Sequence, residues 1–199
     1  LYDKAFLSVT HANDKMPTSK TKMSDWLKET TDPELREYLK LQKNSLALLK
    51  RAAAMPGCYF DRDYSQPNLS MQLPELAHMR SGARLLGMSA RSKAADNDIR
   101  GAIEDVAAVR GMARHMSAEP LLISGLVAVA IASVANDTLE KILRSVQPSV
   151  QDLAALNAEG GISFPRALRR CMIGEQAFGL AAFASISGEG DGRYMYQNI

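Results

Sequence analysis

Apolar side chains recur every three or four positions along most of this chain, which is the spacing of one helix face. No segment shows the alternation of apolar and polar residues that marks a half-buried strand. The pattern therefore predicts an all-α protein of about six or seven helices. The expected helical ranges are 32–55, 74–94, 99–116, 120–146, 149–159 and 163–186. We expect the fourth of these to break or bend near Asn136 and Asp137.

Polar residues and a proline mark where two of these helices start. Asp32 is a good N-cap, Pro33 suits the first helical position, and Glu34 favours the positive end of the helix dipole. Further along, Ser149 and Asp152 resemble a capping box, in which each residue binds the backbone N–H of the other. These local signals agree with the apolar periodicity.

The apolar rows place most of the chain in a single helical domain, 32–187. Residues 1–31 mix short apolar and polar groups and are expected to be an N-terminal arm, with room for a short helix capped by Ser24. Residues 57–72 form a long loop whose aromatic side chains should lie against the body of the protein. Closely spaced glycines predict a flexible C-terminal tail over 188–199.

Composition excludes several classes of protein but does not indicate a particular reaction. Of the 199 residues, 46% are hydrophobic and 6% are aromatic, with 2 Cys and a net charge of +2. The chain is too apolar to be disordered and too poor in cysteine to be a disulfide scaffold. Its balanced charge argues against a nucleic-acid groove, so we expect no nucleic acid among its partners.

One stretch, 121–135, carries no charged residue and consists mostly of apolar side chains. It is shorter than the ~20 residues that a bilayer-spanning helix needs. We therefore expect a helix that is buried on all sides inside a protein core. Packing of this helix across an oligomer interface is the alternative.

The residues that could carry chemistry are dispersed. His11, His78 and His115 lack the spacing of three or four that two metal ligands on one helix face require. The chain has no metal-binding, phosphate-binding or nucleophile motif, so we expect no metal, no cofactor and no catalytic residue. Cys58 and Cys171 could be two thiols or one long-range disulfide, which the sequence leaves open.

Glu175 is the strongest polar candidate for a binding site. Its spacing from Leu168 and Cys171 places it on the apolar stripe of the last helix. A buried carboxylate has to pair with a cation, accept hydrogen bonds or take up a proton. Arginines on neighbouring helices could supply the cation, either in a structural ion pair or in a ligand site. The candidate binding residues are Glu175, Arg84, Arg114 and His115.

Residues 84–116 resemble one degenerate tetratricopeptide-type hairpin. Ala90 and Ala102 have the separation that this repeat uses for its close contact between two antiparallel helices. Asn97-Asp98-Ile99 occupies the turn where the repeat usually has Gly-Asp-Tyr. The chain has no second copy, and stable repeat arrays need at least about three. We therefore expect either an irregular helical bundle with one such hairpin or a short α–α stack.

A second resemblance extends over residues 48–182. The segments that carry it are 48–58, 73–76, 102–106, 119–124, 166–170 and 176–180. Together they look like a family of uncharacterised helical proteins from planctomycete-type bacteria. The resemblance implies a membrane anchor or signal segment ahead of Leu1 and an extracytoplasmic location. It transfers no catalytic residue, because the family has no assigned activity.

These observations favour a non-catalytic helical domain for protein interaction or structure, presented outside the cytoplasm behind an anchor. Its partner would be a protein, with a membrane involved only through a segment upstream of Leu1. The alternative is a helical small-molecule-binding or hydrolytic protein with its site around Glu175 and neighbouring arginines.

Overall fold

The computed structural model describes residues 1–15, 32–60, 73–158 and 162–187. Within these ranges the chain is helical, and no residue lies in a β-strand. The helices are α1 (Tyr2–Lys15), α3 (Pro33–Leu41), α4 (Lys43–Ala53), α5 (Pro74–Ala95), α6 (Ile99–Ser117), α7 (Leu122–Ser145), α8 (Val150–Ala158) and α9 (Phe164–Ser187). The predicted all-α class is confirmed, with eight helices in the described residues against the six or seven expected.

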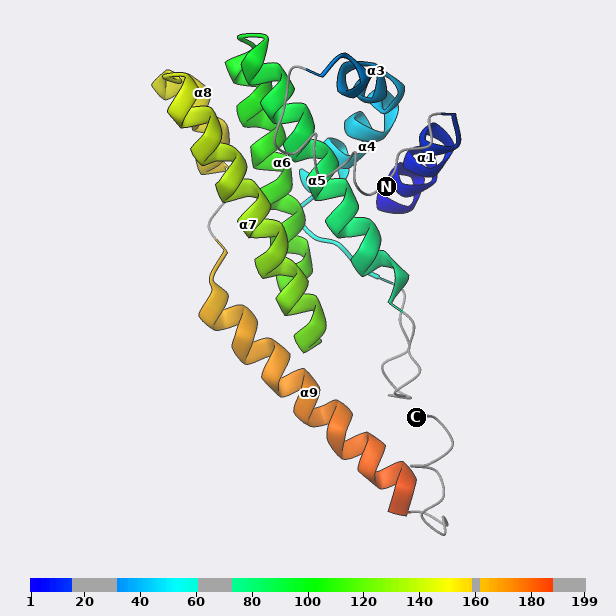
Figure 1. Ribbon diagram of the computed structural model, residues 1–199. Helices are drawn as coiled ribbons and strands as arrows, with labels where there is room; N and C mark the ends of the chain where they lie inside the picture. The colour runs from blue at the N-terminus through cyan, green and yellow to red at the C-terminus, as the bar shows by residue number, and fades with distance from the viewer. Residues whose placement is uncertain (16–31, 61–72, 159–161, 188–199) are drawn as a thin grey trace.

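Helices α5, α6 and α7 lie side by side and form the core of the bundle (Figure 1). Most of α6 is buried, because α4, α5, α7 and α8 all pack against it. Gly87 lets α7 approach α5 closely, since a Cβ added there would lie 3.1 Å from Oγ1 of Thr138. Ala90 and Ala102 are fully buried in the α5–α6 hairpin. The likeness of this hairpin to a tetratricopeptide repeat stays a prediction.

The turn between α5 and α6 follows from its own sequence. Asn97 has a positive φ of 63°, which asparagine tolerates better than most residues. Its N–H donates to the carbonyl of Ala94 (3.1 Å), and the N–H of Asp98 donates to the carbonyl of Lys93 (2.8 Å). These two bonds form a Schellman ending. The Asp98 carboxylate then caps α6 by accepting from the N–H of Gly101 (2.9 Å).

Both helix starts that the sequence predicts are confirmed. Oδ1 of Asp32 accepts from the N–H of Glu34 at 2.8 Å. The N–H of Ser149 donates to the Asp152 carboxylate (2.9 Å), and the N–H of Asp152 donates to Oγ of Ser149 (3.2 Å). Hydrogen bonds from the hydroxyl and N–H of Ser149 lower the pKa of the Asp152 carboxyl. The expected end of this helix at residue 159 lies outside the described residues.

The helix expected over 32–55 is divided in two, which corrects that prediction. Gln42 ends α3 and precedes α4, and it is fully buried. Its Nε2 donates to the carbonyl of Val9 on α1 at 3.5 Å. A polar side chain within an apolar row is thus held inside by a bond to another helix, which no pattern within 32–55 reveals.

The first residues belong to the core, and in this part of the chain the expected arm is absent. Residues 2–15 form α1, which packs mainly against α4. Tyr2, Ala5 and Phe6 are buried. The ring of Phe6 stacks on His78 of α5 with the centroids 5.1 Å apart. Tyr2, Ala5 and Phe6 have the spacing of three and four residues that marks one helix face, so the signal was present in the sequence and the arm prediction overlooked it.

Three expectations fall partly or wholly outside the described residues. The short helix expected at Ser24 and the expected tail over 188–199 lie outside them entirely. So does the loop segment 61–72. At the described start of that loop, Phe60 is buried and Tyr59 is exposed, so one of the two aromatic rings contacts the protein body.

Helix α7 runs without a break through Asn136 and Asp137, so the break considered at these residues does not occur. Both side chains are exposed, so these polar residues leave the buried face of the helix undisturbed. The buried face of α7 is formed by residues such as Val127 and Ile131.

Helix α7 is buried on one side only, which corrects the expectation that 121–135 lies wholly inside the core. Ile123, Leu126 and Val129 are 46%, 58% and 50% exposed. We call these three residues the α7 outer face. By length and composition alone, α7 is the one described helix that could cross a membrane, and a third of its most apolar window is buried.

Candidate functional site

Glu175 caps a helix and does not occupy a buried ion pair. Its Oε1 accepts a hydrogen bond from the N–H of Leu122 at 2.8 Å. Leu122 is the first residue of α7, where free N–H groups and the helix dipole favour a negative charge. Glu175 is half-buried because one side of α9 faces solvent. The expected position on a buried stripe is therefore wrong, and the carboxylate is satisfied by backbone.

Arg114 and His115 bind the end of α4. The Arg114 guanidinium donates to the carbonyls of Ala53 (3.2 Å) and Met55 (3.0 Å). Nε2 of His115 lies 2.9 Å from the same Met55 carbonyl, and its Nδ1 lies 2.9 Å from the hydroxyl of Tyr2. A carbonyl only accepts, so Nε2 carries the hydrogen of the neutral ring and Nδ1 accepts from Tyr2. Both side chains hold α1 and α4 against α6.

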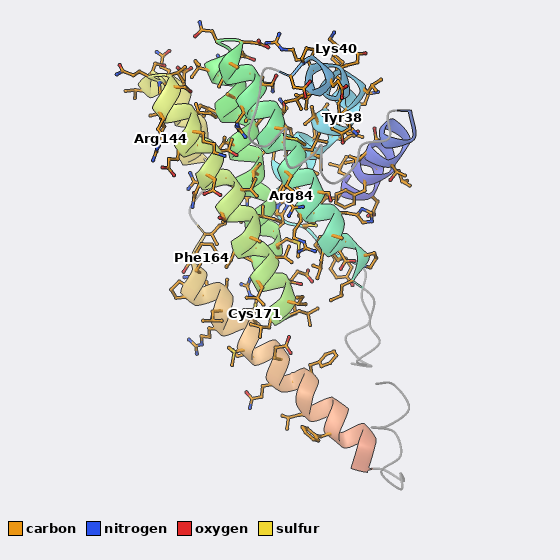
Figure 2. All side chains as sticks on the ribbon, viewed as in Figure 1. Tyr38, Lys40, Arg84, Arg144, Phe164 and Cys171 are labelled. Atoms are coloured by element: carbon orange, nitrogen blue, oxygen red, sulfur yellow. The ribbon has the colours of Figure 1, made fainter. Side chains whose placement is uncertain are left out.

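Arg84 has none of the contacts that the other three candidates make. It is exposed on α5, and Figure 2 shows it well away from Cys171 and the start of α9. Glu175 lies one turn beyond Cys171 on the same helix. Of the four predicted binding residues, Arg114 and His115 share a partner, the Met55 carbonyl, and both serve a structural role there.

Acid is expected to weaken the fold through His115. Burial lowers the pKa of this imidazole below its usual 6.5. Between the folded pKa and 6.5 the unfolded chain binds more protons, so the stabilising contribution is complete above pH 6.5 and declines as the pH falls below it. Urea unfolding measured from neutral to mildly acidic pH should show this loss.

His115→Gln removes the titrating group and should flatten the pH dependence in this window. The parent protein, measured over the same pH range, is the reference. An unaltered acid loss in His115→Gln would contradict the assignment.

Asp105 is the buried ionisable group that sequence reasoning missed. It is fully buried on α6, and its Oδ2 accepts from Oγ of Ser89 (2.6 Å) and from Nζ of Lys93 (2.5 Å). Nζ of Lys50 on α4 lies 3.3 Å from its Oδ1. One carboxylate thereby joins three helices. The sequence did contain a sign that Asp105 is buried. It lies one helical turn after Ala102, on the same face of the helix, where an apolar residue is expected.

The two cysteines are free thiols, which settles the alternative that the sequence left open. Cys171 is buried where α9 crosses α7, and its Sγ donates to the carbonyl of Glu119 at 3.6 Å. Burial raises the pKa of this thiol. A protonated, buried thiol is a poor nucleophile, so Cys171 is a packing residue.

Two of the cavities on the described surface contain none of the predicted binding residues. One, of about 560 Å³, lies between the start of α1 and the end of α4 and includes Cys58 and Glu75. The other, of about 610 Å³, lies between the ends of α5 and α7 and includes Arg91 and Lys141. Among the described residues, no three His, Cys, Asp or Glu side chains gather as metal ligands.

The most distinctive surface is apolar. Helix α9 packs mainly on α7 near Cys171 and then continues past the end of the bundle (Figure 1). Leu180 and Phe183 in this second half are 64% and 67% exposed. We call residues 176–187 the α9 arm. The α9 arm and the α7 outer face together leave large apolar side chains in water.

Comparison with known proteins adds no relative. Scans against protein-family models, curated proteins and solved structures found no significant match for this chain.

Proposed function

We propose that this chain is a non-catalytic helical domain that acts by binding a protein through the α9 arm and the α7 outer face. The observation that carries the proposal is the exposure of large apolar side chains on both elements, Leu126 and Val129 on α7 and Leu180 and Phe183 on α9. Burying one such side chain contributes about 1.5–3 kcal/mol. Monomeric proteins rarely leave contiguous apolar patches of more than a few hundred Å² in water.

The polar candidates support the same conclusion. Glu175 caps α7, while Arg114 and His115 cap α4. Each therefore has a structural partner in place of a shared pocket. A catalytic site needs several such groups within reach of one substrate. In the described residues Glu175 binds the start of α7, while Arg114 and His115 both bind the end of α4.

Site-specific photocrosslinking tests the proposal. We expect p-benzoylphenylalanine at Leu180 to form one discrete protein adduct when the full chain is irradiated in its native cells. The same probe at Leu7 on α1 is the matched control, because Leu7 and Leu180 are exposed to the same extent, 63% and 64%. Leu7 should give no such adduct.

Equal adducts from both positions, or none from either, would contradict the proposal.

A thermal-shift screen of metabolites provides the second measurement. Saturable stabilisation by one chemical class would instead support the small-molecule alternative.

A further inference from the structure

We infer that the partner is a second copy of this chain, and that the α9 arm of one copy lies on the α7 outer face of the other. This inference rests on the proposed function, because it names the partner of the same surface. It follows from charge, length and helix geometry together.

The two surfaces match in charge. Residues 176–187 contain no charged side chain, and neither do residues 121–136. Placing the α9 arm on the α7 outer face therefore removes no ionised group from water, which would otherwise cost several kcal/mol. Both contribute large aliphatic or aromatic side chains, so their contact excludes water from apolar area on both sides.

The two surfaces also match in length. At 1.5 Å per residue the α9 arm is about 18 Å long, and the uncharged part of α7 is about 22 Å long. Gly179 leaves open space at the middle of the arm, since no atom lies within 4 Å of a Cβ added there. A helix with a small residue at its centre can approach a second helix closely.

One chain cannot bring these surfaces together by itself. Helix α9 is continuous and is held at its crossing with α7, where Gly174 lies against Pro120 and Cys171 lies against Gly125. Beyond that crossing the α9 arm leads away from the bundle (Figure 1). The arm therefore reaches an α7 outer face only on another molecule.

A two-fold dimer uses both surfaces of both copies. Half the cylinder of a helix about 18 Å long and about 10 Å wide is on the order of 300 Å². Two arms and two α7 faces then bury on the order of 1,200 Å², the lower end of the range for stable interfaces. The same patch on each copy satisfies the self-complementarity that two-fold symmetry requires.

A lipid surface fits these features less well. The α9 arm has no lysine or arginine to bind anionic headgroups, and Glu189 and Asp191 follow it in the sequence. On α7, Val127 and Ile131 are buried against the bundle, so that helix cannot enter a bilayer without losing its core contacts. A protein surface of the same apolar character is the better complement.

Sedimentation equilibrium of the purified full chain tests the inference. We expect a dimer at micromolar concentration, and a monomer for Leu180→Asp combined with Phe183→Asp. Leu126→Asp combined with Val129→Asp should dissociate it equally. All four side chains are at least half exposed, so circular dichroism should show each variant folded. Leu7→Asp on α1 is the matched control and should remain dimeric.

Photocrosslinking from Leu180 in the purified protein should map to residues 122–135 of a second copy. A wild-type monomer, or a dimer that survives both pairs of substitutions, would overturn the inference. So would flotation of a monomer with phosphatidylglycerol vesicles. The two proposals can fail separately. If the purified chain is monomeric but the probe at Leu180 still crosslinks to a different protein in cells, the dimer inference fails and the proposed function stands. If the probe at Leu180 crosslinks to no protein at all, both fail.

Discussion

Replacing Lys50 and Lys93 together by methionine is expected to lower the free energy of unfolding by about 3–5 kcal/mol. The change leaves the Asp105 carboxylate fully buried, with the Ser89 hydroxyl as its remaining partner among the described residues. Methionine keeps the apolar length of the lysine stem, so the loss reports on the missing charge. Urea unfolding followed by circular dichroism measures the effect.

Removing the Asp105 carboxylate should lower the free energy of unfolding by less than removing its two lysine partners. In Asp105→Ala the ammonium groups of Lys50 and Lys93 can turn to water, because their side chains are 35% and 29% exposed. We expect a loss of about 1–3 kcal/mol for this variant. Lys40→Met, at an exposed lysine paired with Glu37, is the control and should change stability by less than about 0.5 kcal/mol. A larger loss of unfolding free energy in Asp105→Ala than in the double lysine variant would contradict the view that an unpaired buried carboxylate causes the destabilisation.

Gly174→Ala is expected to detach α9 from α7. A Cβ at this position would overlap the carbonyl oxygen of Pro120, and a backbone atom cannot rotate away as a side chain can. Relieving the overlap costs about 1–3 kcal/mol. Cys171, buried at the same crossing, should then react about tenfold to hundredfold faster with a thiol reagent, in a Cys58→Ser background.

Gly179→Ala is the matched control on the same helix. The added methyl group meets open space within the molecule, so the reactivity of Cys171 should stay at the level of the parent protein. Equal thiol reactivity in the two glycine variants would mean that the Gly174–Pro120 contact does not hold α9 in place.

Local signals were sufficient for most of the helices. Asp32, Asn97 and Ser149 act on backbone groups within a few residues, so their effects are visible in sequence and are confirmed in the structure. Gln42 shows the limit of this reasoning. It lies between α3 and α4, where one helix was predicted, and its side chain bonds to the Val9 carbonyl on α1, a partner far away in the sequence.

The site predictions failed for the same reason. Periodicity placed Glu175 on an apolar stripe, but only the crossing of α9 and α7 determines that the N–H of Leu122 is its partner. His115 was expected to be a binding residue, but its bonds to Tyr2 and Met55 depend on how α1 and α4 pack against α6. Asp105 was overlooked because a single carboxylate in an apolar row carries no sign of two lysines arriving from other helices.

The sequence by itself determined an all-α class, the main helix starts and the dispersal of reactive groups, because periodicity and capping act over a few residues. The tertiary structure decided which faces of those helices are covered. Helix α7 carries enough apolar residues to be buried on all sides, yet Leu126 and Val129 remain exposed. Burial depends on the neighbours that the fold supplies, and the bundle supplies them on one side of α7 and at only one end of α9.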